Sequence, residues 1–166
     1  MNTLDQKVIE MGEEIFRLYG LDNLSAKIIS TLYFEPHELS MEEIAESTGY
    51  SLSSISLKMG PLENVWGVKR IKKAGSRKAY FYVEKNMSNI MIELFMKACE
   101  IESRLTEKYL PPIIEEYREK AVDEYEIERL SILENYCSQL EGFKQLLEVM
   151  IELLPEIQSN VARENK

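Results

Sequence analysis

Residues 40–56 read SMEEIAESTGYSLSSIS, and this stretch decides the fold. Ser40 and Glu43 fit a capping box, in which a serine hydroxyl and a glutamate carboxylate accept hydrogen bonds from the first free N–H groups of a helix. Gly49 suits the left-handed conformation that follows a helix C-terminus, and Ser51 can cap a second helix. That second helix has apolar residues at helical spacing that we expect to face inward: Leu52, Ile55, Met59 and Leu62. The pattern predicts a helix-turn-helix.

After the second helix, the spacing of the apolar residues changes from that of a helix to that of a strand. Alternation over 68–72 predicts a strand, 73–76 predicts a turn, and the aromatic-rich stretch 77–83 predicts a second strand. One hairpin alone is only marginally stable, so this one is expected to pack on the neighbouring helices. We expect Trp66 to anchor it on the second helix. A helix-turn-helix followed by a basic hairpin predicts a winged helix.

Two helices are predicted before this unit. Apolar residues spaced by four and three predict a helix that reaches about residue 19 and ends at Gly20. A second, over about 26–34, is closed by Glu35 because a residue before a proline is disfavoured in the α region.

The rest of the sequence is also predicted to be helical. An apolar stripe over 87–109 is expected to end at Pro111-Pro112, and a short charged segment, 113–121, then leads into a helix over about 125–154. The predicted fold class is therefore mostly α (α+β): a winged helix-turn-helix domain with long N- and C-terminal dimerisation helices.

We expect three regions: an N-terminal helix that contributes to dimerisation (1–19), the DNA-binding domain (20–85) and a C-terminal helical dimerisation region (86–166). The last helix has a heptad seam, interrupted by Lys144, and a broad apolar face that pairing with a second chain would cover. An intramolecular antiparallel helix pair is the alternative. The expected interface residues are apolar and lie in the terminal helices: Leu4, Val8, Met11, Leu94, Leu133, Leu140, Leu147 and Ile151.

Charge is distributed unevenly along the chain. The net charge is −9, but residues 51–85 hold eight Lys/Arg and two acids, so this segment is basic within an acidic protein. Such a segment indicates contact with a polyanion, most simply duplex DNA. A solvated basic hairpin without a partner is the alternative.

The candidate DNA contacts lie on the second helix and the hairpin. Short hydroxyl side chains let a helix approach the major groove and hydrogen-bond to bases or phosphates, although serines at these positions are also typical of plain solvated surface. Bases on the hairpin can contact the backbone or a minor groove and supply affinity rather than sequence reading. The predicted DNA-binding residues are Ser51, Ser53, Ser54, Ser56, Lys58, Lys72, Lys73, Ser76, Arg77 and Lys78.

The stretch from Leu39 to Ser56 resembles the winged helix of MarR-type regulators, and Gly75–Phe81 (GSRKAYF) resembles the wing of their GbsR-like branch. The resemblance implies a homodimeric transcription regulator that dimerises through its terminal helices, reads DNA with residues 51–58 and places Arg77 in the wing. Gly60-Pro61 departs from the family pattern. Because Pro61 removes a helical hydrogen bond, we expect a kink there, which affects the reach of Lys58 and the end of the helix.

Other classes of function have little support. Cys99 and Cys137 occupy apolar helix positions and are expected to be buried thiols. His37 is the only histidine, in an apparent surface loop. No enzyme motif, metal site or cofactor site is expected, and no stretch of the sequence indicates a signal peptide or a membrane span. A cytoplasmic protein is the default.

A small-molecule effector of unknown identity is possible. Some GbsR-like relatives respond to choline-type ligands, which favour an aromatic cage. Four tyrosines of the C-terminal helices could contribute to one, although core or interface positions are the commoner role: Tyr109, Tyr117, Tyr125 and Tyr136.

The sequence therefore favours a homodimeric regulator that binds a pseudo-palindromic duplex, with one helix in the major groove and the wing alongside it. Two other functions stay open: a winged-helix module for protein–protein assembly, and a ligand sensor with weak DNA affinity.

Overall fold

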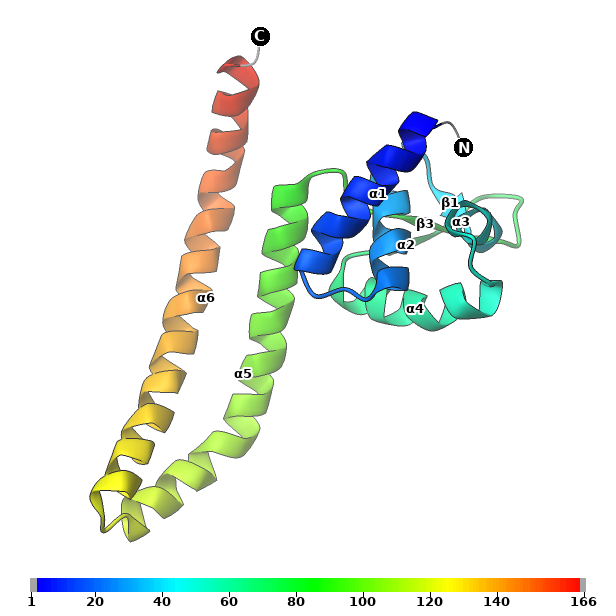
Figure 1. The fold of residues 1–166 in the computed structure, drawn as a ribbon. Coiled ribbons are helices and arrows are strands. Elements are labelled where there is room, and N and C mark those ends of the chain that lie inside the picture. Colours follow the sequence, from blue (N-terminus) through cyan, green and yellow to red (C-terminus); the bar gives the residue numbers. More distant parts are fainter. Residues whose placement is uncertain (1–2, 165–166) are drawn as a thin grey trace. The chain divides into compact units, whose positions relative to one another are not determined.

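The computed structural model describes residues 3–164, and the chain divides into two compact units, Met1–Met91 and Ile92–Lys166. Helices predominate, with one small sheet (Figure 1). Within the described residues, no helix is long and apolar enough to cross a bilayer. The elements in chain order are α1 (Thr3–Leu18), α2 (Asn23–Phe34), β1 (Leu39–Ser40), α3 (Met41–Thr48), α4 (Leu52–Val65), β2 (Lys69–Lys72), β3 (Ala79–Tyr82), α5 (Met87–Lys120) and α6 (Glu124–Glu164).

The helix boundaries of the first unit follow local capping chemistry. Asp22 accepts hydrogen bonds from the first N–H groups of α2. The capping box of Ser40 and Glu43 at α3 is confirmed, as are the left-handed Gly49 (φ 75°) and the Ser51 cap of α4. The helix-turn-helix is thus confirmed as predicted.

The core of this unit lies where α2, α3 and α4 meet. Its largest fully buried side chains on these helices are Ile28, Ile29, Leu32, Ile44, Ile55, Met59 and Leu62. The expectation that Leu52 faces inward is wrong, because 49% of this side chain is exposed. Leu52 is the first residue of α4 and lies almost a turn before Ile55, where burial begins.

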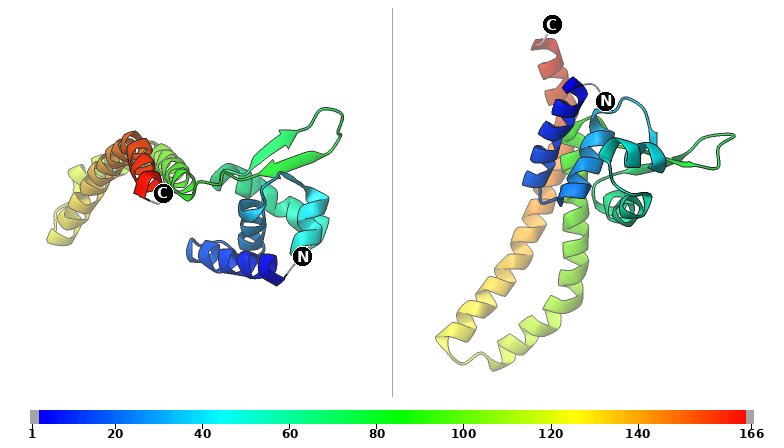
Figure 2. Two further views of the ribbon diagram at one scale, coloured as in Figure 1. Left: turned by 90° about the horizontal axis from the view of Figure 1, so that it is seen from above. Right: turned by 45° about the vertical axis from the view of Figure 1, so that its right-hand side comes forward.

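The sheet has three antiparallel strands in the order β1–β3–β2. The hairpin of β2 and β3 was predicted, with Gly75 in its turn at φ 79°, and Figure 2 shows it reaching beyond the helices of the same unit. The third strand was not predicted. It has only two residues, which is too few for alternation to show, and it exists because Ser40 pairs with Tyr80 and Leu39 with Phe81.

Trp66 lies at the end of α4 and is buried. Among the described residues, its ring lies 5.9 Å from the ring centre of Phe16 in α1 and 6.3 Å from that of Tyr19, directly after α1. These aromatic contacts join the N-terminal segment to the end of α4, and the expectation that Trp66 anchors the hairpin stays a prediction.

The prolines of the second unit do not end its helices. The expected stop at Pro111-Pro112 and the separate segment 113–121 are wrong, because α5 continues to Lys120. Each proline removes only its own N–H bond, and the flanking helical bonds remain. Figure 1 shows α5 changing direction in this yellow-green part, which is the usual result of proline within a helix.

The boundaries of α6 also differ from the prediction. The helix passes Pro155 and reaches Glu164, beyond the predicted end near residue 154. It begins beside Asp123, which accepts a hydrogen bond from the N–H of Glu126 (2.8 Å). Glu126 in turn accepts one from the N–H of Val122 (2.9 Å). An acid followed three residues later by a glutamate was a readable start signal.

Gly12 allows α1 and α2 to cross closely. The hydroxyl of Ser30 donates a hydrogen bond to the carbonyl of Ile9 (2.7 Å), and a Cβ on residue 12 would lie 2.2 Å from that hydroxyl oxygen and 2.7 Å from the Phe34 ring. We therefore expect Gly12→Ala to lower the free energy of unfolding by about 1–3 kcal/mol, measured by urea denaturation.

Gly142→Ala is the matched control, because a Cβ there meets nothing within 4 Å. It lies inside α6 and is expected to raise helix stability by up to about 1 kcal/mol. Equal unfolding midpoints for wild type and Gly12→Ala would contradict the close crossing.

Candidate nucleic-acid interface

The outer face of α4 lies opposite its buried residues. Its exposed positions follow helical spacing: Ser53, Ser56, Leu57, Gly60, Pro61 and Asn64. Leu57 is 78% exposed, and nothing lies within 4 Å of a Cβ built at Gly60. Leu57 and Asn64 are not among the predicted residues, although both lie opposite the apolar stripe of the helix.

The predicted serines fall into two groups. The hydroxyl of Ser51 lies 2.9 Å from the hydroxyls of both Ser53 and Ser54, and it also accepts the N–H of Ser54. Ser54 is half-buried, whereas Ser53 and Ser56 are exposed. Ser51 and Ser54 therefore serve the start of the helix, and Ser53 and Ser56 are the accessible hydroxyls of its outer face.

Lys58 is held by an acid at the start of α2. Its Nζ lies 3.0 Å from the Asp22 carboxylate. Burial raises the pKa of Asp22, but hydrogen bonds from Lys58 and Ser25 outweigh that effect and lower the pKa to about 2. Helix α4 continues through Pro61 to Val65, so the proline does not end it, and the ion pair with Asp22 fixes the direction of Lys58.

The wing has paired and unpaired cations. Lys73 lies 3.0 Å from Glu38 and 4.1 Å from the centre of the Tyr80 ring, and Lys78 lies 3.5 Å from Glu42. In the part of the chain that the structure describes, no ion-pair partner is found for Lys72 or for Arg77. Both of these side chains are exposed.

Ser76 supports the tip of the wing, where its hydroxyl accepts a hydrogen bond from the N–H of Lys78 (3.1 Å). Two other bases of this segment stabilise the fold. Arg70 lies 2.8 Å from Glu63 and so joins β2 to α4. Lys85 donates to the carbonyl of Leu32, and burial lowers its pKa. Sequence reasoning missed these pairings because they join residues that are distant or belong to different elements.

The predicted interface residues differ in exposure. Leu4, Val8, Met11 and Ile151 are exposed, and Leu147 is buried within the single chain. The remaining three are half-buried: Leu94, Leu133 and Leu140. Large apolar side chains are nevertheless exposed along α6: Ile127, Ile132, Phe143, Leu146, Val149, Met150, Leu153 and Ile157.

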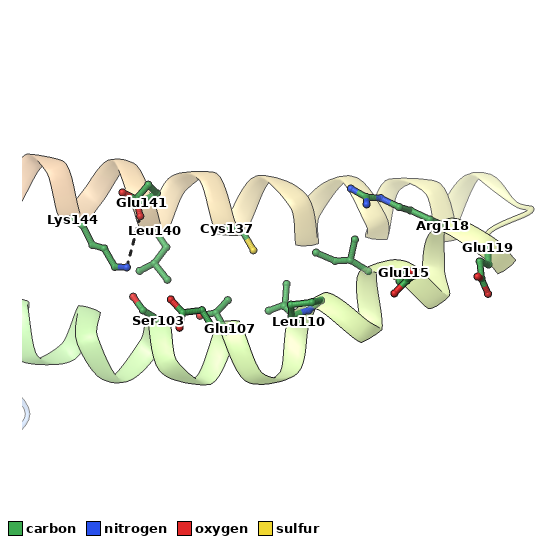
Figure 3. Close-up of a pocket in the computed structure, with 13 residues that line it drawn as sticks. Ser103, Glu107, Leu110, Glu115, Arg118, Glu119, Cys137, Leu140, Glu141 and Lys144 are labelled. Carbon is green, nitrogen blue, oxygen red and sulfur yellow. Dashed lines mark ion pairs between the residues drawn. The ribbon is translucent and has the colours of Figure 1, made fainter.

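A cavity of about 800 Å³ lies between α5 and α6, and Figure 3 shows the side chains of both helices turned toward it. Its lining is apolar and charged: Ser103, Thr106, Glu107, Leu110, Pro111, Ile114, Glu115, Arg118, Glu119, Cys137, Leu140, Glu141 and Lys144. Cys99 is buried as expected, and burial raises its pKa. Cys137 is exposed and lines the cavity, so the expectation that it is buried is wrong.

The four tyrosines do not line this cavity. Tyr109 lies beside Lys108 and Tyr125 beside Arg129, while the Tyr136 hydroxyl donates to Glu102. An aromatic cage around the cavity is therefore not formed. Among the described residues, no group of His, Cys, Asp and Glu could hold a metal ion. His37 is exposed, in agreement with the sequence.

The chain aligns with several solved structures. A crystal structure of a transcriptional regulator aligns with 92% of this chain and 98% of its own, at 16% identity and a TM-score of 0.74. MepR, a transcription regulator of the Staphylococcus aureus multidrug efflux pump MepA, aligns with 84% of this chain and 93% of its own at 14% identity, with a TM-score of 0.40. A MepR mutant bound to an oligodeoxyribonucleotide aligns with 84% of this chain and 92% of its own at 14% identity, with a TM-score of 0.41.

No protein-family model and no curated protein sequence matches the chain. The first of these structures shows the fold, and it bears out the predicted winged-helix class.

The ion pair of Asp22 with Lys58 predicts a pH-dependent stability. The folded-state pKa of Asp22, about 2, lies below the ordinary 3.8, so its carboxylate stabilises the fold above about pH 4, and this contribution is lost as the pH falls toward 2. Asp22→Asn keeps a capping oxygen but removes the charge. We expect it to lower stability by at most about 1 kcal/mol at neutral pH, because the pair is half exposed.

Thermal melts of wild type and Asp22→Asn between pH 7 and pH 2.5 measure this effect. The difference between the two proteins should narrow below pH 4. A difference that stays constant over the whole range would show that the charge of Asp22 contributes nothing.

Proposed function

We propose that the chain is a MarR-type, DNA-binding transcription regulator that acts as a homodimer, with α4 in the major groove and the wing on the flanking backbone or minor groove. One observation carries the proposal: the outer face of α4 bears small side chains and lies in the same unit as a hairpin whose exposed Arg77 has no ion-pair partner among the described residues. The likeness of Gly75–Phe81 to the GbsR-like wing supports that branch.

The side chains of α4 suit a helix that enters a groove. B-DNA's major groove is about 12 Å wide and admits one helix. Ser53, Ser56 and Gly60 project little from that helix, so its backbone can approach the base edges. The hydroxyls can hydrogen-bond to bases, and the exposed Leu57 can contact a thymine methyl group.

The wing supplies charge rather than sequence reading. Lys72 and Arg77 are exposed cations that can neutralise phosphates or enter a minor groove, which gives affinity that weakens with salt. Lys58, Lys73 and Lys78 contribute less, because each already has an acidic partner.

The exposed apolar side chains of α1, α5 and α6 support dimerisation through the regions 1–19 and 86–166, with 20–85 binding DNA. A monomer rarely exposes so much apolar surface without a use for it. A twofold dimer would place two α4 helices on half-sites of a pseudo-palindrome.

The cavity between α5 and α6 favours a second role, a response to a small effector. Its volume of about 800 Å³ lies within the range of pockets that hold small molecules. The effector would bind in the second unit, whereas α4 and the wing belong to the first.

Mutations can distinguish sequence-specific base contacts from sequence-independent phosphate contacts. Arg77→Ala is expected to weaken binding to the selected and the random duplex alike. It should also lower the slope of log K against log[salt] by about one unit, because it removes one phosphate contact. Ser56→Ala is expected to reduce the free energy of binding to the selected duplex by about 1–3 kcal/mol and to leave binding to random DNA almost unchanged. Fluorescence anisotropy at several salt concentrations, on a duplex selected from genomic DNA and on a random one, measures both.

Equal losses on both duplexes for Ser56→Ala would contradict the role of α4 in reading sequence. Ser54→Ala is a useful comparison, because Ser54 bonds to the helix cap and should affect the stability of α4 as well as binding.

The dimer has its own test. Ile151 is exposed on α6, so Ile151→Asp should leave the fold of the monomer intact and weaken a paired interface. Analytical ultracentrifugation at micromolar concentration should give twice the chain mass of 19.3 kDa for wild type and for the control Ser138→Asp, and the monomer mass for Ile151→Asp. A wild-type mass of one chain would contradict dimerisation.

A further inference from the structure

The two flanks of the wing are held by glutamates. Lys73 follows β2 and Lys78 precedes β3, so the two lysines stand on opposite sides of the turn. Each pairs with an acid from the helix-turn-helix side, Lys73 with Glu38 before β1 and Lys78 with Glu42 in α3. All four side chains keep about a third or more of their surface exposed, so DNA could reach them.

The backbone makes these pairs part of the fold. The antiparallel pairing of Ser40 with Tyr80 sets β3 beside the start of α3, which brings the acids around Ser40 next to the wing. Glu43 is committed to the capping box. Glu38 and Glu42 flank Ser40 without serving that box, and both face the lysines of the wing.

We propose that Glu38 and Glu42 compete with DNA phosphates for Lys73 and Lys78, and so hold down the affinity of the protein for DNA of arbitrary sequence. The inference rests on the proposed function, because it concerns the same wing and the same partner. It assigns Glu38 and Glu42 a role in specificity, although neither is expected to touch a base.

Two physical effects support this competition. A lysine held by a carboxylate must exchange that partner for a phosphate, and the released carboxylate then repels the DNA. Lys72 and Arg77, which have no such partner among the described residues, are wing cations that meet DNA without this exchange. Random binding depends almost wholly on cation–phosphate contacts, so the competition removes a larger share of its total binding free energy than it removes from binding that also uses base contacts.

The competition does not switch with pH in the neutral range. The pKa of Glu38 is lowered by its own backbone N–H and by Lys73, and that of Glu42 by its own backbone N–H and the charge of Lys78. Both carboxylates are therefore ionised at neutral pH.

The test uses Glu38→Gln and Glu42→Gln, which keep the shape of each side chain and remove its charge. Glu46→Gln is the matched control: Glu46 is an exposed acid one turn further along α3, and within the described part of the chain it has no ion pair. The probe is a random-sequence duplex of about 30 base pairs, with anisotropy read at several NaCl concentrations.

We expect each of the first two variants to bind the random duplex about three- to tenfold more tightly at low salt. The slope of log K against log[NaCl] should steepen by up to about one unit. In the wild type, the carboxylate released from its lysine takes up a cation from solution, and the glutamine variants have no such carboxylate. Glu46→Gln should change both quantities much less.

Unchanged affinity in Glu38→Gln and Glu42→Gln, with a wild type that binds, would overturn this inference and leave the proposed function standing. An equal gain in all three variants would also overturn it, since net charge alone would then explain the effect. A wild type without salt-dependent duplex binding would instead refute the proposed function. Glu38 lies outside the helices, so Glu38→Gln decides the question even if Glu42→Gln disturbs α3.

Discussion

Ser40 joins the helix-turn-helix to the wing, and the arrangement of the candidate interface depends on it. Its hydroxyl accepts the N–H of Glu43, its own N–H donates to the Glu43 carboxylate (2.7 Å), and its backbone pairs with Tyr80 of β3. The residue is 2% exposed. The start of α3 and the position of the wing are thus fixed at one point, and with them the distances between the wing lysines and their glutamates.

Under the proposed function, this constraint would let an acidic chain present a selective basic surface. The basic segment has the charge to bind any polyanion, but the fold pairs Lys58, Lys73 and Lys78 with acids. The wing cations Lys72 and Arg77 and the small side chains of α4 have no such partners among the described residues. Affinity would then depend on both contacts being made together, which favours one DNA sequence over the rest.

The features that could be predicted from the sequence are those that depend on residues close together in the chain. The caps at Ser40 and Ser51, the turn at Gly49 and the alternating strands of the wing each depend on neighbouring residues, and all are confirmed. Long-range pairing was not predictable: the two-residue strand β1 and the partners of Lys58 and Lys73 arise only when distant segments meet.

The prolines of α5 and α6 lie within continuous helices. The predicted end of a helix at Pro111-Pro112 assumed that propensity alone decides, whereas the bonds on either side of these prolines keep α5 continuous to Lys120. The heptad seam of α6 predicted Leu147 as a residue of the dimer interface, whereas this side chain is already buried within the single chain.

The most direct test of the central claim is a nuclear magnetic resonance titration of the ¹⁵N-labelled protein with a duplex selected from genomic DNA. The account predicts that the amide signals of residues 53–60 and 73–78 shift or broaden together at the lowest DNA concentrations. An absence of change, or changes confined to residues 92–164, would contradict the assignment of α4 and the wing as the surface that binds DNA.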